Sequence, residues 1–140
     1  MGTQPITVAL LAMPAVTAAT LYGFHDFLCG VHRDWSELHG GHAESPFRSM
    51  VVSRDGLPLE GANGVRIVPE ASFDTCGAPD VVCVTDMALA PDEPLGSAYD
   101  AEVNWLRERH AQGAMLASAC SGAMLLARAG LLEGLDATTH

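Results

Sequence analysis

The chain alternates between short apolar runs and longer segments whose apolar residues recur at helical spacing. The continuous apolar runs are typical of parallel strands covered on both faces. We expect such strands at residues 5–13, 47–53, 80–85 and 114–119. The amphipathic segments between and after them predict helices at residues 18–31, 98–111 and 122–129. Strands and helices in this order predict an α/β fold, a doubly wound and mostly parallel sheet with helices on both faces.

Glycine-rich and polar stretches mark where these elements end. A polar loop containing Gly40 and Gly41 is expected after the first helix, and two short apolar pieces around Asn63-Gly64 predict a small hairpin. Residues 136–140 look like the entrance to a further strand. An open sheet would continue there, so we interpret residues 1–140 as one domain that is truncated at its C-terminus.

Composition and charge exclude several classes of function. The formal charge is −10, with seven arginines and no lysine, which makes the chain by itself a poor ligand for nucleic acid. The apolar start at residues 6–13 lacks a preceding positive charge and is too short for a membrane span. The cysteines show no paired CxxC spacing, so we expect a reduced, cytoplasmic protein without membrane contact. The four are Cys29, Cys76, Cys83 and Cys120.

The most informative segment is the junction Ser118-Ala119-Cys120-Ser121-Gly122, where a predicted strand passes directly into a predicted helix. Such a turn forces its middle residue into a strained conformation and needs small neighbours, because strand and helix approach closely. It would present Cys120 at the carboxyl edge of the sheet, where open α/β folds bind ligands. The start of a helix also favours a thiolate. The alternative is that Cys120 is a small buried packing residue.

The run ASACSGAMLLARAGLLEGLDATTH resembles the nucleophile-elbow segment of PfpI-type, class I glutamine amidotransferase-like domains, especially those fused to AraC-type transcription regulators. Further pieces agree with the resemblance, namely LYGFHDFL, NGVRIVPE, APDVVCVTD and NWLRERHAQGAM. The resemblance implies a flavodoxin-like fold, dimers, and a helix-turn-helix domain beyond residue 140 that would contact DNA. It also places His140 beside Cys120, as a Cys–His pair for thiol catalysis requires; a terminal histidine with no role is the alternative.

Two departures from the family pattern favour sensing over catalysis. The acidic residue that many PfpI-type enzymes carry at the start of the first helix is missing around Thr20, and Asp86-Met87 replaces a Gly-Gly turn that helps to form an oxyanion hole. We therefore predict a sensor domain of an AraC-type regulator that binds a small metabolite through Cys120, Ser121, Asp86, Met87 and Thr20, without a cofactor. The alternatives are a PfpI-type cysteine hydrolase or isonitrile-hydratase-like enzyme using Cys120 and His140, and redox sensing through a Cys120 sulfenic acid.

Two weaker patterns complete the predictions. His25, Cys29 and His32 recur at helical spacing, which permits a metal site, but we interpret them as core and surface positions of the first helix and expect no metal. In the helix at 98–111, Val103, Leu106 and His110 are expected on one side. Trp105 is expected to be a packing anchor, while Glu102 and the nearby charged residues form a solvated face.

Overall fold

A computed structural model of the chain describes residues 4–41, 45–90 and 92–139. These residues form one parallel sheet of five strands, a separate two-stranded hairpin, three α-helices and two 3₁₀ turns. In chain order the elements are β1 (Ile6–Leu11), α1 (Ala18–His39), β2 (Phe47–Ser53), β3 (Leu59–Glu60), η1 (Ala62–Gly64), β4 (Arg66–Ile67), β5 (Ala71–Ser72), β6 (Val81–Val84), η2 (Ser97–Tyr99), α2 (Asp100–Ala111), β7 (Met115–Ser118) and α3 (Gly122–Arg128).

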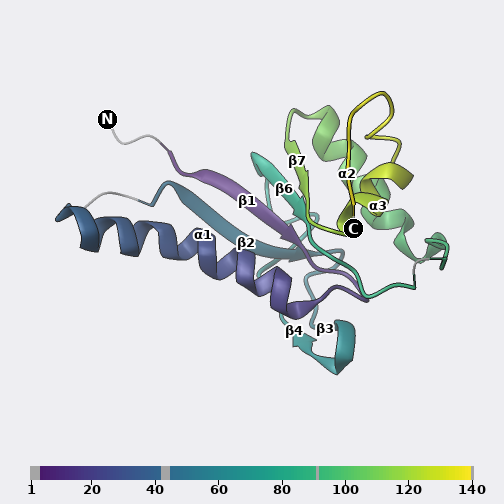
Figure 1. Cartoon of the computed structure of the whole chain (residues 1–140), viewed down its shortest axis with the longest axis horizontal. Helices are drawn as coiled ribbons and strands as arrows, with labels where there is room; N and C mark the ends of the chain where they lie inside the picture. Colours follow the sequence, from purple (N-terminus) through teal and green to yellow (C-terminus); the bar gives the residue numbers. More distant parts are fainter. Residues whose placement is uncertain (1–3, 42–44, 91, 140) are drawn as a thin grey trace.

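The sheet has the order β5-β2-β1-β6-β7, and all of its pairs are parallel. The chain leaves the central strand β1 in one direction through α1 to β2, and later continues from β6 through α2 to β7 on the other side (Figure 1). The two connections diverge at the boundary between β1 and β6. In open α/β sheets such a switch point forms a crevice at the carboxyl ends of the strands, which is where ligands bind.

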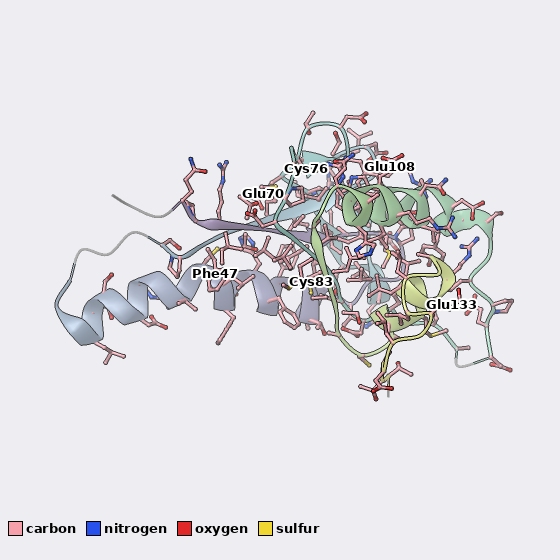
Figure 2. All side chains as sticks on the ribbon, turned by 90° about the horizontal axis from the view of Figure 1, so that it is seen from above. Phe47, Glu70, Cys76, Cys83, Glu108 and Glu133 are labelled. Atoms are coloured by element: carbon pink, nitrogen blue, oxygen red, sulfur yellow. The ribbon has the colours of Figure 1, made fainter. Side chains whose placement is uncertain are left out.

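The core lies around β1, whose continuous apolar run is buried as the sequence predicts. Ala9, Leu10 and Leu11 are fully buried in it. Helix α1 packs against β1 and β2, and α2 lies on the opposite side of the sheet (Figure 2). The α/β class and the parallel, doubly wound arrangement predicted from the sequence are confirmed.

Several boundaries differ from the prediction. Helix α1 continues past Val31 to His39, because nothing in the polar segment breaks a helix until Gly40, which adopts a left-handed φ of 64°. The antiparallel hairpin forms as predicted between β3 and β4. Strand β5 was not predicted, since two residues are too few to show a period.

The strand expected at the C-terminal end is absent from the described residues 136–139. This segment contacts the turn after β7 through a side chain, as the Thr139 hydroxyl donates a hydrogen bond of 3.1 Å to the Cys120 carbonyl. A strand needs a ladder of backbone bonds to a neighbour, and none joins residues 136–139 to β7. His140 lies outside the described residues.

Candidate functional site

The turn between β7 and α3 has the strained geometry that the sequence predicts. Cys120 has a φ of 53°, in the left-handed region that residues with a side chain seldom adopt. The turn presses closely on β6: a Cβ atom on Gly122 would lie 2.2 Å from the Val84 carbonyl oxygen. The same oxygen accepts a hydrogen bond of 2.9 Å from the Ala119 amide. A small residue is therefore a steric requirement at position 122, close to Cys120, whose own side chain is exposed.

The segments that follow β1 and β6 join each other beside this elbow. The Thr17 amide donates to the Asp86 carbonyl at 3.1 Å, and the Ala88 amide donates to the Ala15 carbonyl at 2.8 Å. Ala15 also has a positive φ, of 69°. The two strand ends at the topological switch point are thus fixed to each other by backbone bonds, which form a defined rim at this part of the carboxyl edge.

Ser121 fastens the elbow to this rim. Its hydroxyl accepts a hydrogen bond of 2.8 Å from the Met87 amide and donates one of 3.0 Å to the Met87 carbonyl. Both residues are buried, Ser121 to 4% exposure. The single O–H donor of Ser121 is committed to the backbone, and the Met87 N–H is committed to Ser121. Neither group is available to a ligand or an oxyanion in this arrangement.

Replacing Ser121 by alanine is expected to destabilise the fold by about 1–3 kcal/mol, because the buried Met87 amide loses its partner, while the Met87 carbonyl keeps only the bond from the Leu89 amide. Chemical denaturation followed by circular dichroism would measure the change. Ser118→Ala is the matched control, since Ser118 is exposed at the end of β7, and it should leave the free energy of unfolding within about 0.5 kcal/mol. Equal stability of Ser121→Ala and wild type would contradict the role given to Ser121.

The remaining predicted residues lie near the same edge but contribute differently. Asp86 is half-buried, and its Oδ1 atom is buried without a hydrogen bond among the described residues. Thr20 is half-buried in the first turn of α1, a turn without acidic residues. It is Thr17 rather than Thr20 whose backbone bonds to Asp86. The rim thus links the start of α1, through Thr17 and Asp86, to the elbow, through Met87 and Ser121, while the histidine expected to complete a catalytic pair, His140, lies outside the described residues.

The other cysteines differ from Cys120 in their surroundings. Cys83 lies buried in β6, and burial raises the pKa of its thiol, as expected for a packing residue. Burial also raises the pKa of the Cys76 thiol. On α1, the pKa of the exposed Cys29 is raised, first by partial desolvation and then by the negative charges of Glu70 and Asp26.

A second feature at the carboxyl edge was missed by sequence reasoning. Glu102, predicted to face solvent, is 1% exposed and forms a two-pronged ion pair with Arg54, the residue that follows β2. The pair borders a hollow of about 380 Å³ at the ends of β1 and β2.

His110, predicted on the same side as Val103 and Leu106, is exposed. Trp105 is a packing residue as predicted, stacked on Phe73 with ring centroids 4.4 Å apart.

Comparison with known proteins places this geometry in context. No protein-family model matches the chain. Among solved structures, a ThiJ/PfpI family protein from Pseudomonas syringae aligns with a TM-score of 0.67 and 27% identity, over 94% of this chain and 48% of that one. The chain is similar to ThiJ/PfpI-type domains. An AraC family transcriptional regulator from Pseudomonas putida has the same fold, with a TM-score of 0.70 and 21% identity over 97% of this chain and 67% of that one.

Two curated proteins are similar to the chain in sequence. The HTH-type transcriptional regulator CdhR of Pseudomonas aeruginosa is 34% identical over 94 residues, which is 67% of this chain and 27% of the regulator. The isonitrile hydratase of Pseudomonas putida is 28% identical over 144 aligned positions, covering 96% of this chain and 52% of the hydratase. The chain therefore spans about half of one relative and about a quarter of the other. None of the described helices is both long enough and apolar enough to cross a membrane.

Proposed function

We propose that this chain is the ligand-sensing domain of an AraC-type transcription regulator, and that it binds a small metabolite at the carboxyl edge of the sheet beside Cys120. The similarity to a ThiJ/PfpI-type domain and to an HTH-type regulator supports the regulatory part of the proposal. The observation that carries the choice of sensing over turnover is the bond from the Met87 amide to Ser121. An oxyanion hole needs backbone donors aimed at the substrate, and this donor is used internally.

The rest of the proposal concerns the whole protein. With a charge of −10 the chain by itself is poorly suited to DNA, so DNA contact would come from a separate helix-turn-helix domain. We also propose that the protein is a cytoplasmic homodimer, since a regulator acts in the cytoplasm and paired domains match paired half-sites in DNA.

The proposal can be tested by a thermal-shift screen of small metabolites. A ligand is expected to raise the melting temperature of wild type and of Cys120→Ser alike, because sensing uses the crevice rather than thiol chemistry. Thr20→Trp should abolish the shift by filling the crevice, whereas Ala111→Trp, at the exposed end of α2, should keep it. A ligand that still raises the melting temperature of the Thr20→Trp protein would refute the proposed location.

The alternative function is that of a cysteine enzyme similar to isonitrile hydratase, and the alignment over 96% of the chain favours it. An isonitrile and water would give an N-substituted formamide. We expect no formamide above the level produced by Cys120→Ala. Formamide production that depends on Cys120 would overturn the sensing proposal in favour of the enzyme.

A further inference from the structure

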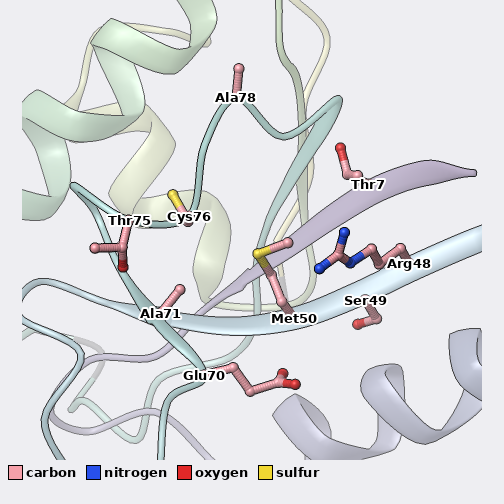
Figure 3. A pocket seen from close by; sticks show the side chains of 9 residues that line it. All are labelled: Thr7, Arg48, Ser49, Met50, Glu70, Ala71, Thr75, Cys76 and Ala78. Atoms are coloured by element: carbon pink, nitrogen blue, oxygen red, sulfur yellow. The ribbon is translucent and has the colours of Figure 1, made fainter.

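A hollow of about 390 Å³ lies between α2 and the segment that follows β5. The strand β5 is at one edge of the sheet, whereas the elbow follows β7 at the opposite edge. From α2 the hollow is lined by Trp105, Glu108 and Arg109, whose spacing places them on one face of the helix. The segment after β5 supplies Phe73, Asp74 and Gly77. The same segment also lines the separate hollow that Figure 3 shows, there through Thr75, Cys76 and Ala78.

Two contacts fix the walls of the α2 hollow to each other. The Trp105 ring stacks on Phe73 with ring centroids 4.4 Å apart and an interplanar angle of 6°. The Arg109 Nη1 atom donates a hydrogen bond of 2.9 Å to the Gly77 carbonyl. The hollow is therefore formed by the fold itself, as sites for small molecules usually are.

Two N–H groups in these walls have no acceptor. Trp105 Nε1 and Arg109 Nε are both buried without a hydrogen bond in the part of the chain that the structure describes, and they are the only N–H donors of its side chains in this state. Trp105 as a whole is 4% exposed. Buried donors are nearly always paired, because an unpaired one loses its bond to water and gains nothing in return. Two such donors in one hollow indicate an acceptor that comes from outside the chain.

The charges around the hollow restrict the kind of acceptor. The guanidinium of Arg109 is positive, but the exposed carboxylates of Asp74 and Glu108 line the same hollow. Negative charges thus outnumber positive ones here, as they do in the whole chain with its charge of −10. An anion would be repelled, whereas an uncharged carbonyl oxygen has two lone pairs and can accept both N–H groups.

We propose that the α2 hollow binds a small uncharged molecule whose carbonyl oxygen accepts hydrogen bonds from Trp105 Nε1 and Arg109 Nε. The rings of Phe73 and Trp105 supply the apolar surface against which the rest of the molecule packs. The site lies apart from Cys120 and does not rest on the sensing function.

The test titrates the chain with benzamide and follows the indole N–H signals by ¹H–¹⁵N NMR. The chain has two tryptophans, so Trp105→Phe or Trp35→Phe tells their signals apart. Benzamide should move the Trp105 indole proton downfield to a plateau, because its N–H gains an acceptor, and the Trp35 signal is the internal reference. Benzoate has nearly the same shape but is an anion, and should bind about fivefold more weakly. Benzylamine lacks an acceptor and should cause no downfield shift.

Arg109→Lys keeps the positive charge but removes the Nε–H group, and should weaken benzamide binding about fivefold. The matched control is Arg48→Lys, which changes an exposed arginine in the hollow of Figure 3 and should bind benzamide as wild type does. Melting temperatures without benzamide would separate lost binding from lost folding, and the wild-type titration decides the matter alone if Arg109→Lys does not fold. An unmoved Trp105 signal in wild type, unchanged affinity in a folded Arg109→Lys protein, or benzoate binding as tight as that of benzamide would overturn the proposal.

Discussion

Gly122→Ala is expected to destabilise the domain by more than about 3 kcal/mol, beyond the usual cost of one extra methyl group in a packed site. The added Cβ would lie 2.2 Å from the Val84 carbonyl oxygen and 2.7 Å from that of Thr85. These are backbone atoms, so no side-chain rotation relieves the overlap. The Val84 oxygen is also held by the Ala119 amide, and β6 cannot retreat from α3 without breaking that bond.

Urea denaturation of both proteins would measure the effect, and the matched control is Gly23→Ala. Gly23 lies inside α1, and nothing is within 4 Å of the position its Cβ would take. Alanine there should stabilise the protein by about 0.5–1 kcal/mol, because glycine loses more backbone entropy in a helix. The same substitution thus has opposite signs at the two sites. A Gly122→Ala protein as stable as wild type would show that the elbow is not packed against β6 as described.

The elbow could be predicted from sequence because its constraint is local. A strand that passes directly into a helix needs small residues at fixed offsets, and Ala119 and Gly122 supply them around Cys120. The bond between Ser121 and Met87 could not be predicted, since 34 positions separate the two residues. It forms only because β6 and β7 are neighbours in the sheet. The consequence, a Met87 amide that is not available to a ligand at the carboxyl edge, is visible only in three dimensions.

The helices show the same division between local and tertiary information. Spacing alone indicated that His25 and Cys29 share a face of α1. The contact between the His25 ring and the Ser49 hydroxyl depends on how α1 packs on β2. In α2, Glu102 looks like a surface residue by composition, because a glutamate near a helix start is usually solvated. Its burial is explained by Arg54, a partner 48 positions away. The spacing of apolar residues along one helix does not predict an ion pair with a residue so far away in the sequence.

Arg54→Ala is expected to lower the free energy of unfolding by about 2–3 kcal/mol. Arg54 Nε and Nη2 lie 3.2 and 2.7 Å from the two carboxylate oxygens of Glu102, and Nη2 also donates to the Ala98 carbonyl at 2.7 Å. Removing one partner of a fully buried pair costs about 3–5 kcal/mol, because the other charge stays buried and unpaired. The expected value is lower, since half of the Arg54 side chain is exposed and water can partly replace it.

The control is a double variant, Arg54→Met with Glu102→Leu, measured by urea denaturation beside Arg54→Ala. It removes both charges and keeps apolar bulk, so it should be more stable than Arg54→Ala alone. An Arg54→Ala protein within about 0.5 kcal/mol of wild type would show that Glu102 finds solvent without its partner. The pair joins the end of β2 to α2 beside the hollow at the carboxyl edge. Loosening it should therefore widen that hollow while leaving the bond between Ser121 and Met87 intact, and the exposure of Cys120 to alkylation should not change.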